Sequence, residues 1–228
     1  MSNKLLFTFH ALLSLVFPLL PFLNQKILPI TTRIITLYAL IFFSFFYFRN
    51  QIKPYKPADV ITAFRLLIAV FILYITPKNI IPFFVIFLII VFAEALDGMD
   101  GKIARKTGTT QFGAIWDMET DAFFILILSY ISVFYLNYPW WILGFGMIRY
   151  LFYFIFYSLK PENAGFPKSL SKFSKTICVS TVLILGLFWI IPIKPGKFLG
   201  FINLLFLTAS FLWEGNFYLK LRSQTKNL

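Results

Sequence analysis

The stretch Leu96–Phe123, "LDGMDGKIARKTGTTQFGAIWDMETDAF", holds five of the nine acidic residues in the chain. Apolar segments flank it on both sides, and the short polar turn "KTGTTQ" lies in its middle. This pattern predicts two consecutive helices that pack antiparallel across the turn. Carboxylates on the two helices would then face each other inside a mostly apolar protein.

The composition of the chain places those helices in a bilayer. The chain has 228 residues, of which 59% are hydrophobic and 21% aromatic, and its mean hydropathy is +0.81. These values lie far outside the range of soluble domains. An N-terminal apolar stretch resembles a signal peptide but lacks a small-x-small cleavage pattern, so we interpret it as a retained anchor.

Apolar runs near the roughly 20 residues that span a bilayer recur along the whole chain. We predict a helix for each run, because only helices and closed barrels satisfy the backbone in lipid. The predicted fold is an all-α polytopic membrane protein with a six-helix transmembrane core, residues 57–228. An N-terminal transmembrane helix pair with a basic linker, residues 1–56, precedes the core. The eight predicted segments are 5–23, 30–48, 60–76, 79–104, 112–136, 140–158, 175–193 and 198–217.

The basic residues indicate the orientation in the membrane. With a cytoplasmic N-terminus, fourteen Lys and Arg residues lie inside, five lie outside, and Arg65 and Arg149 fall within spans. This bias follows the positive-inside rule and predicts a cell inner or plasma membrane protein with its acidic site on the cytoplasmic side. The net charge of +12 is spread over short loops, so we expect no nucleic acid partner.

Few residues offer soft metal ligands. Cys178 is the only cysteine, which excludes a disulfide and a thiolate metal site. His10 is the only histidine, and the sequence gives it no role.

The acidic residues near the centre of the chain follow helical spacing. Asp97 and Asp100 share a face with Gly101 and Ala104, at i, i+3, i+4 and i+7. On the next helix Gly113, Asp117 and Asp121 follow i, i+4 and i+8.

Antiparallel packing would point these four carboxylates into one cleft. An unpaired carboxylate in a membrane helix costs roughly 2.5–3.5 kcal/mol, so the group requires a cation. An all-oxygen site suits Mg²⁺ or Mn²⁺, with Ca²⁺ as a possible substitute or inhibitor, and carboxylates from two helices could bridge two ions. Glycines on the same faces would let a phosphate approach, and Arg105 could neutralise a diphosphate.

Taken together, the acidic and small residues of these two predicted helices match a family signature. The pattern Asp97-x2-Asp100-Gly101-x2-Ala104-Arg105-x7-Gly113-x3-Asp117-x3-Asp121 resembles the complete signature of the CDP-alcohol phosphotransferases. All eight positions are occupied, in order. The resemblance spans only 25 residues, but eight fixed positions are far more specific than a lone glycine motif.

The resemblance implies roles for the signature residues. Asp97, Asp100, Asp117 and Asp121 would hold the divalent ions, and Asp121 would be the general base. From the number of carboxylates we expect two ions. Gly101, Ala104, Arg105 and Gly113 would border the CDP moiety. Family members also tend to carry an Asn-like residue, a Thr and an Arg at the start of the first core helix. Here these positions hold Asp59, Thr62 and Arg65, which share one face and could reach the nucleotide; Asp59 departs from the usual Asn.

The expected activity is transfer of a phosphatidyl group from CDP-diacylglycerol to an alcohol, with release of CMP. Glycerol 3-phosphate or another phosphorylated polyol is the favoured acceptor, because Arg149, Lys172 and Lys175 could form a pocket for an anionic headgroup. Two alternatives stay open: a CDP-choline or CDP-ethanolamine enzyme acting on diacylglycerol, and a divalent-cation transporter. A transporter is disfavoured because the outer halves of the spans offer no polar relay.

Two further acidic residues and one pair of glycines have less specific interpretations. Glu119 faces away from Asp117 and Asp121 on the predicted helix. Glu94 could support a metal ligand or pair with Arg65 or Arg149. The "GFG" at Gly144–Gly146 could be a close helix contact within a predicted homodimer.

Overall fold

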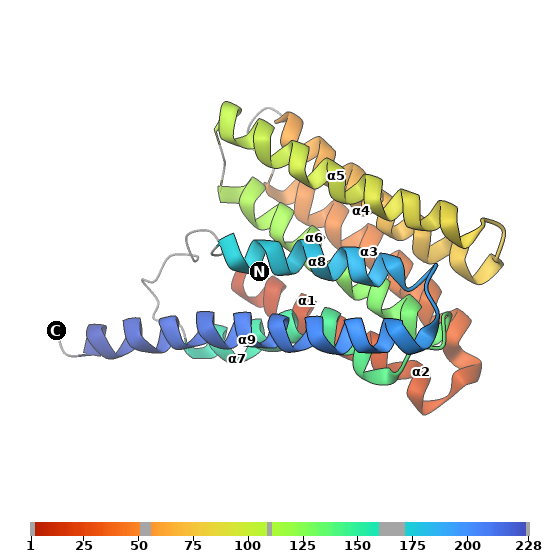
Figure 1. The fold of residues 1–228 in the computed structure, drawn as a ribbon. Helices are drawn as coiled ribbons and strands as arrows, with labels where there is room; N and C mark the ends of the chain where they lie inside the picture. Colours follow the sequence, from red (N-terminus) through yellow and green to blue (C-terminus); the bar gives the residue numbers. More distant parts are fainter. Residues whose placement is uncertain (1–2, 51–55, 109–110, 160–171, 227–228) are drawn as a thin grey trace.

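The computed structural model describes residues 3–50, 56–108, 111–159 and 172–226, and within a few helix ends it describes only the backbone. All regular structure in this part is helical (Figure 1). The all-α prediction is therefore confirmed. The long helices are α1 (Asn3–Val16), α3 (Leu28–Asn50), α4 (Pro57–Ile75), α5 (Phe83–Thr107), α6 (Gln111–Phe134), α7 (Gly144–Leu159), α8 (Lys172–Leu187) and α9 (Ile193–Lys226).

Helix boundaries differ from the predicted segments at both ends of the chain. The predicted segment 5–23 is split into α1, a 3-10 turn at Phe17–Leu19 and the short α2 (Leu20–Leu23). Pro18 and Pro21 explain the split, because each removes a backbone donor from a continuing helix. The last helix, α9, runs for 34 residues and extends well past the apolar segment 198–217.

Three stretches are long and apolar enough to cross a membrane within the described residues: Gln25–Phe45, Pro57–Lys78 and Ile193–Trp213. The predicted number of eight spans is thus not confirmed. Helices α5 and α6 each carry three carboxylates within a long apolar sequence, which sets them apart from these three stretches. The three apolar stretches agree with an integral membrane protein.

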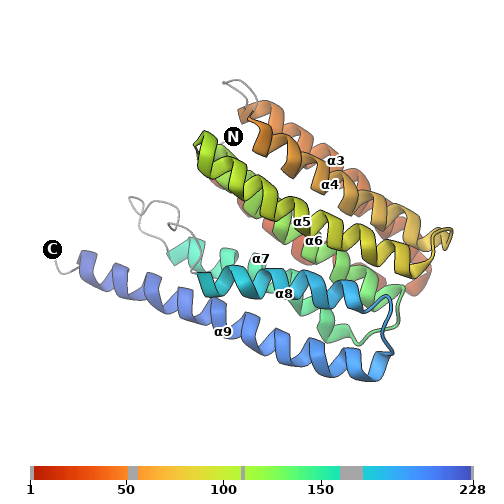
Figure 2. The ribbon, with the colours of Figure 1, turned by 45° about the horizontal axis from the view of Figure 1, so that its top comes forward.

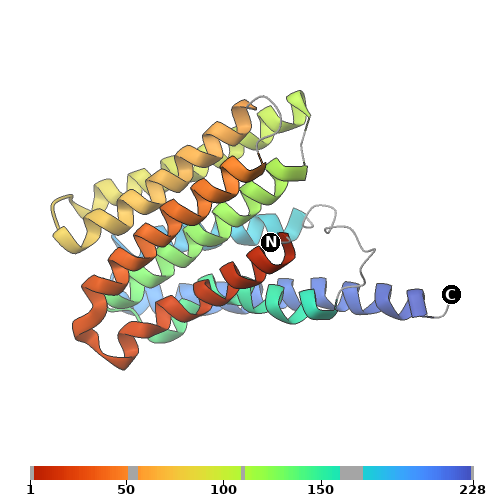
Figure 3. The ribbon, with the colours of Figure 1, turned by 180° about the vertical axis from the view of Figure 1, so that it is seen from behind.

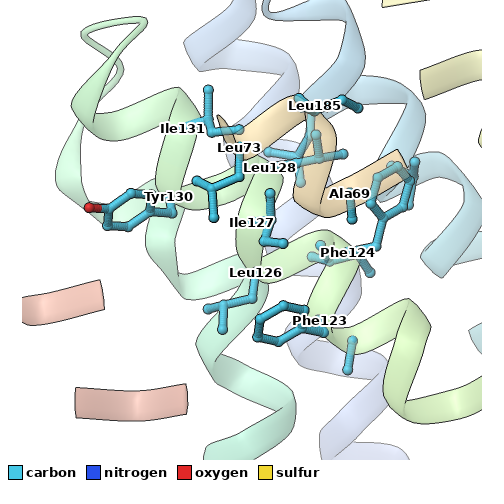
Figure 4. Close-up of a cluster of buried hydrophobic side chains, with 14 of the residues drawn as sticks. Ala69, Leu73, Phe123, Phe124, Leu126, Ile127, Leu128, Tyr130, Ile131 and Leu185 are labelled. Carbon is cyan, nitrogen blue, oxygen red and sulfur yellow. The ribbon is translucent and has the colours of Figure 1, made fainter. Parts of the chain in front are cut away.

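Helix α6 lies at the centre of the bundle and contacts α3, α4, α7 and α8. Every residue from 122 to 132 is buried, as expected for a helix enclosed on all sides. Figure 4 shows the apolar side chains of this stretch against Ala69 and Leu73 of α4 and Leu185 of α8. The buried apolar part of α6 therefore packs at the centre of the bundle. The acidic residues of α6 all lie before it, in the first half of the helix.

The helices form successive layers, with α3 and α4 on one side, α5 and α6 between, and α7, α8 and α9 on the other (Figure 2). Seen from behind, α1 crosses the face of the bundle beside α7 (Figure 3), and the two helices are in contact. Helix α3 is joined to α6 by polar contacts: Thr32 Oγ1 lies 2.7 Å from the Tyr135 hydroxyl and 3.2 Å from that of Tyr130. The N-terminal helices are thus packed onto the same bundle as α4–α9.

A glycine ends α5 and starts the turn toward α6. Gly108 has φ +80°, a conformation that L side chains rarely adopt, so the chain can leave the helix sharply there. Its carbonyl oxygen accepts a hydrogen bond from Lys56 Nζ, just before α4. The contact brings the start of α4 to the acidic ends of α5 and α6.

Gly146 permits the close packing of α7 on α6. A Cβ at this position would lie 2.4 Å from the Leu126 Cα, far inside contact distance. At Gly144, the same atom would meet only the Leu204 methyl groups, at 3.6 and 3.7 Å. The close contact predicted for this "GFG" exists, but within one chain, so the motif gives no support to a dimer.

We expect Gly146→Ala to destabilise the protein by about 1–3 kcal/mol, because the added methyl group must push the α6 backbone away from α7. Gly144→Ala is the matched control on the same helix, and it should be neutral or slightly stabilising because alanine favours helix. Thermal unfolding in detergent micelles measures both variants. Equal melting temperatures for the two would contradict the packing seen here.

Candidate active site

Three aspartates from α5 and α6 converge near the end of the bundle where the two helices are connected. Asp97, Asp117 and Asp121 each offer a carboxylate oxygen, and these oxygens lie within 4.8 Å of one another. Their side chains are 26%, 42% and 33% exposed, respectively. The group is thus partly covered by helices but open to a ligand from one side.

Arg65 of α4 supplies positive charge to this cluster. Its guanidinium donates to Asp97 Oδ1 at 2.6 Å and to Asp121 Oδ1 at 2.7 Å. Asp117 Oδ1 lies 3.4 Å away. The side chain is only 2% exposed, and its Nε donates to the Ala93 carbonyl at 3.1 Å. An arginine buried this deeply needs such partners, and the carboxylates equally need the arginine.

The fourth aspartate lies deeper. Asp100 is buried, and its Oδ2 accepts a hydrogen bond from Thr62 Oγ1 at 3.1 Å and lies 3.7 Å from Arg65 Nη1. All four predicted carboxylates surround one guanidinium. The direct packing predicted for α5 and α6 is not seen in the described part of the chain, because the two helices have little contact with each other there; α4 packs against both, and its Arg65 joins their carboxylates. Three of them form the open group, while Asp100 lies behind it.

Helix α4, the first helix of the predicted core, contacts the aspartates through the face that its residue spacing predicted. Thr62 and Arg65 both contact them. Asp59 is buried in the first turn of the same helix. The sequence placed these three residues near the nucleotide; in the structure, Thr62 and Arg65 bind the acidic side chains.

The structure describes the other residues predicted to bind the nucleotide, and two of those predicted to bind the acceptor, less fully. Gly101 and Gly113 are half-buried, in α5 and α6. The side chains of Ala104, Arg105, Lys172 and Lys175 lie outside the described residues, although their backbones belong to α5 and α8.

The donor set fits a hard divalent cation. In the part of the chain that is described, the only group of three or more potential ligands is made of aspartates alone. Mg²⁺ and Mn²⁺ prefer such oxygen donors, whereas Zn²⁺ sites usually contain His or Cys. Asp97, Asp117 and Asp121 are the residues that could hold the ion.

A second polar cluster lies on another side of α6. Glu119 is 5% exposed, and its Oε1 accepts a hydrogen bond from Arg149 Nη2 of α7 at 3.2 Å. Its Oε2 lies 3.5 Å from His10 Nε2 of α1. The expectation that Glu119 faces away from the aspartates is consistent with these partners. The sequence indicated no role for His10, because neither its position nor its neighbours reveal that it meets residue 119.

Glu94 keeps a buried carboxylate oxygen, Oε2, that makes no hydrogen bond among the described residues. The sequence suggested Arg65 or Arg149 as its partner. In the structure, Arg65 is paired with the aspartates and Arg149 with Glu119.

The arrangement can be compared with known proteins. A family model described as CDP-alcohol phosphatidyltransferase matches residues 55–213, which include all eight signature positions. The chain belongs to this family. No curated protein and no solved structure matches the chain significantly.

As a CDP-alcohol phosphatidyltransferase, the protein is a membrane transferase of phospholipid biosynthesis that moves a phosphatidyl group from a CDP-alcohol to an acceptor. The family match begins just before α4, so α1–α3 lie outside it. The aspartate cluster is where a member of this family would hold a divalent metal.

Proposed function

We propose that this CDP-alcohol phosphatidyltransferase uses CDP-diacylglycerol as donor and a small alcohol, preferably a phosphorylated polyol such as glycerol 3-phosphate, as acceptor. The observation that carries the proposal is the cluster of Asp97, Asp117 and Asp121, whose oxygens lie within 4.8 Å of one another at the open end of two antiparallel helices. A site of this kind can grip a diphosphate through bound Mg²⁺ or Mn²⁺. The lipid chains of the donor would stay in the bilayer.

In the reaction, the acceptor hydroxyl attacks the β-phosphorus of the donor, a new P–O bond forms, and the bond to CMP breaks. Divalent ions in such a site, one or two in number, would neutralise the diphosphate and stabilise the departing CMP oxygen. Asp97, Asp100, Asp117 and Asp121 are the proposed metal ligands.

Asp121 is the proposed general base for the acceptor hydroxyl. Its Oδ1 receives a hydrogen bond from Arg65 at 2.7 Å, which holds the carboxylate in one orientation. A base with a set orientation can meet the hydroxyl proton when the acceptor arrives. Arg65 is therefore proposed as an orienting residue for the carboxylates in addition to its expected place near the nucleotide.

The nucleotide would lie against α5 and the start of α6. Gly101 and Gly113 leave room for phosphates, with Ala104 between them in sequence and Arg105 available to a phosphate oxygen. Asp59 and Thr62 extend this site along α4. Arg149, together with Lys172 and Lys175, is proposed to receive an anionic acceptor, and the active site is proposed to face the cytoplasm. The homodimer stays a prediction.

CMP release from purified protein tests the function. We expect release with CDP-diacylglycerol and glycerol 3-phosphate or another phosphorylated polyol, dependent on added Mg²⁺ or Mn²⁺ and lost when EDTA removes the metal, because the carboxylates then have no ion to share with the diphosphate. Serine, glycerol and phosphatidylglycerol complete the acceptor panel, and CDP-choline and CDP-ethanolamine with diacylglycerol complete the donor panel.

CMP release only with CDP-choline or CDP-ethanolamine would show that the donor belongs to that class instead of being CDP-diacylglycerol. Absence of CMP from every pair would contradict the proposed chemistry. Metal uptake into liposomes without CMP release would favour transport.

A further inference from the structure

The cluster formed by Glu119, Arg149 and His10 is buried and lies beside the acidic site. Glu119 belongs to α6, between Asp117 and Asp121 in sequence, and its carboxylate is contacted by Arg149 on one oxygen and by His10 on the other. Side-chain exposure is 7% for Glu119 and 1% for His10. A buried carboxylate with partners on both oxygens can adopt few other orientations.

The histidine is itself held from several directions. Its Nδ1 contacts the Tyr38 hydroxyl of α3. Its ring stacks on Phe42, with centroids 4.0 Å apart and planes 7° apart, and Phe43 meets it edge-on. All of these residues lie in α1 and α3, outside the family match. The N-terminal helices thus form a rigid support that presents Nε2 to Glu119.

Arg149 is the most exposed member of the cluster. Its side chain is 20% exposed, whereas the carboxylate that it contacts is nearly covered. An arginine side chain loses rotamer entropy when it binds a ligand, so fixing it beforehand favours capture of an anion.

We propose that His10 is a positioning residue, which holds Glu119 and through it Arg149 in the orientation that receives the anionic acceptor. The inference rests on the proposed function of Arg149. It adds that the N-terminal helices are part of the machinery that selects the acceptor. His10 itself touches neither substrate nor metal.

Steady-state kinetics of His10→Phe test the inference in the full-length protein. Phenylalanine keeps the ring but removes the nitrogen that faces Glu119. His10 Nε2 and Glu119 Oε2 lie 3.5 Å apart, and Nε2 makes no hydrogen bond among the described residues, so the variant removes a polar contact and not a hydrogen bond. We expect the KM for glycerol 3-phosphate, or for the phosphorylated polyol that the wild type uses, to rise severalfold when this contact is lost. The kcat and the KM for CDP-diacylglycerol should stay within about twofold, and His10→Gln, whose amide can still donate to Glu119, should restore the acceptor KM.

Thr32→Val is the matched control. It removes hydroxyl contacts between α3 and the Tyr130 and Tyr135 side chains without touching Glu119. If the acceptor KM rises equally in Thr32→Val and His10→Phe, loosening of the N-terminal helices explains the effect and the inference is overturned. It is also overturned if His10→Phe lowers kcat alone, or raises the acceptor KM as much in an Arg149→Lys background as in the wild type.

If the wild-type protein releases no CMP, the proposed function is contradicted and the acceptor KM cannot be measured. A second measurement then tests the inference independently. His10→Phe, Arg149→Lys and the double variant are compared by thermal unfolding. The two residues make no contact that joins them directly, so a non-additive loss of stability is expected only if both act through Glu119. Additive losses would overturn the inference.

Discussion

Asp121→Asn is expected to lower CMP release by more than about 100-fold. The variant removes one of three carboxylates whose oxygens lie within 4.8 Å of one another, and it also removes the proposed base. Even residues that only support metal ligands are worth about 10–100-fold, so loss of a ligand should exceed that range. Turnover is measured by CMP release, and metal affinity by Mn²⁺ binding to the same preparations.

The two measurements separate the roles of Asp121. Weaker Mn²⁺ binding with lost turnover indicates a metal ligand, whereas unchanged binding with lost turnover indicates a base alone. Glu214→Gln provides the matched acid-to-amide control, because Glu214 belongs to α9, away from the helices that carry the aspartates. Near-normal turnover in Asp121→Asn would remove this residue from both roles.

Arg65→Met is expected to lower the melting temperature by roughly 10 °C. The substitution keeps much of the side-chain volume but leaves carboxylates that now lie 2.6 Å and 2.7 Å from the guanidinium without their cation. Breaking a buried ion pair in this way costs about 3–5 kcal/mol, and each kcal/mol lowers the melting temperature by about 2–4 °C in a chain of this size. Thermal unfolding in detergent micelles measures the shift.

Added metal provides an independent check of this prediction. Because Mg²⁺ or Mn²⁺ can replace the missing positive charge, it should raise the melting temperature of Arg65→Met more than that of the wild type. Lys197→Met, at an exposed position of α9, controls for loss of a cation and should have almost no effect. Equal stability of Arg65→Met and the wild type would mean that the carboxylates do not depend on Arg65.

Residue spacing was enough to predict much of the acidic site. Asp97 and Asp100 on one helix, and Asp117 and Asp121 on the next, were placed on facing sides by helical periodicity and a short turn. In the structure all four lie around Arg65 of α4, the helix that packs against both α5 and α6. Spacing could not tell that Asp100 lies behind the other three, because depth depends on how α4 packs against α5.

The contacts of the two intramembrane arginines were not predictable in the same way. Arg65 and Arg149 were each recognised as charges in need of partners, yet several acids were available to each. The partners are determined by helix rotation and by which helices are neighbours, and neither leaves a periodic pattern. His10 shows this most clearly, since it meets a residue 109 positions later in the chain.

By itself, the sequence determined that the chain is helical, that its carboxylates share two helix faces, and to which family it belongs, because apolar periodicity and a fixed spacing are local properties. Only the tertiary structure decided the rest: that one guanidinium joins four aspartates, that Gly146 brings α7 onto α6, and that α1 supports Glu119. These contacts join residues far apart in the chain, and they exist because the packed bundle brings particular faces of its helices together.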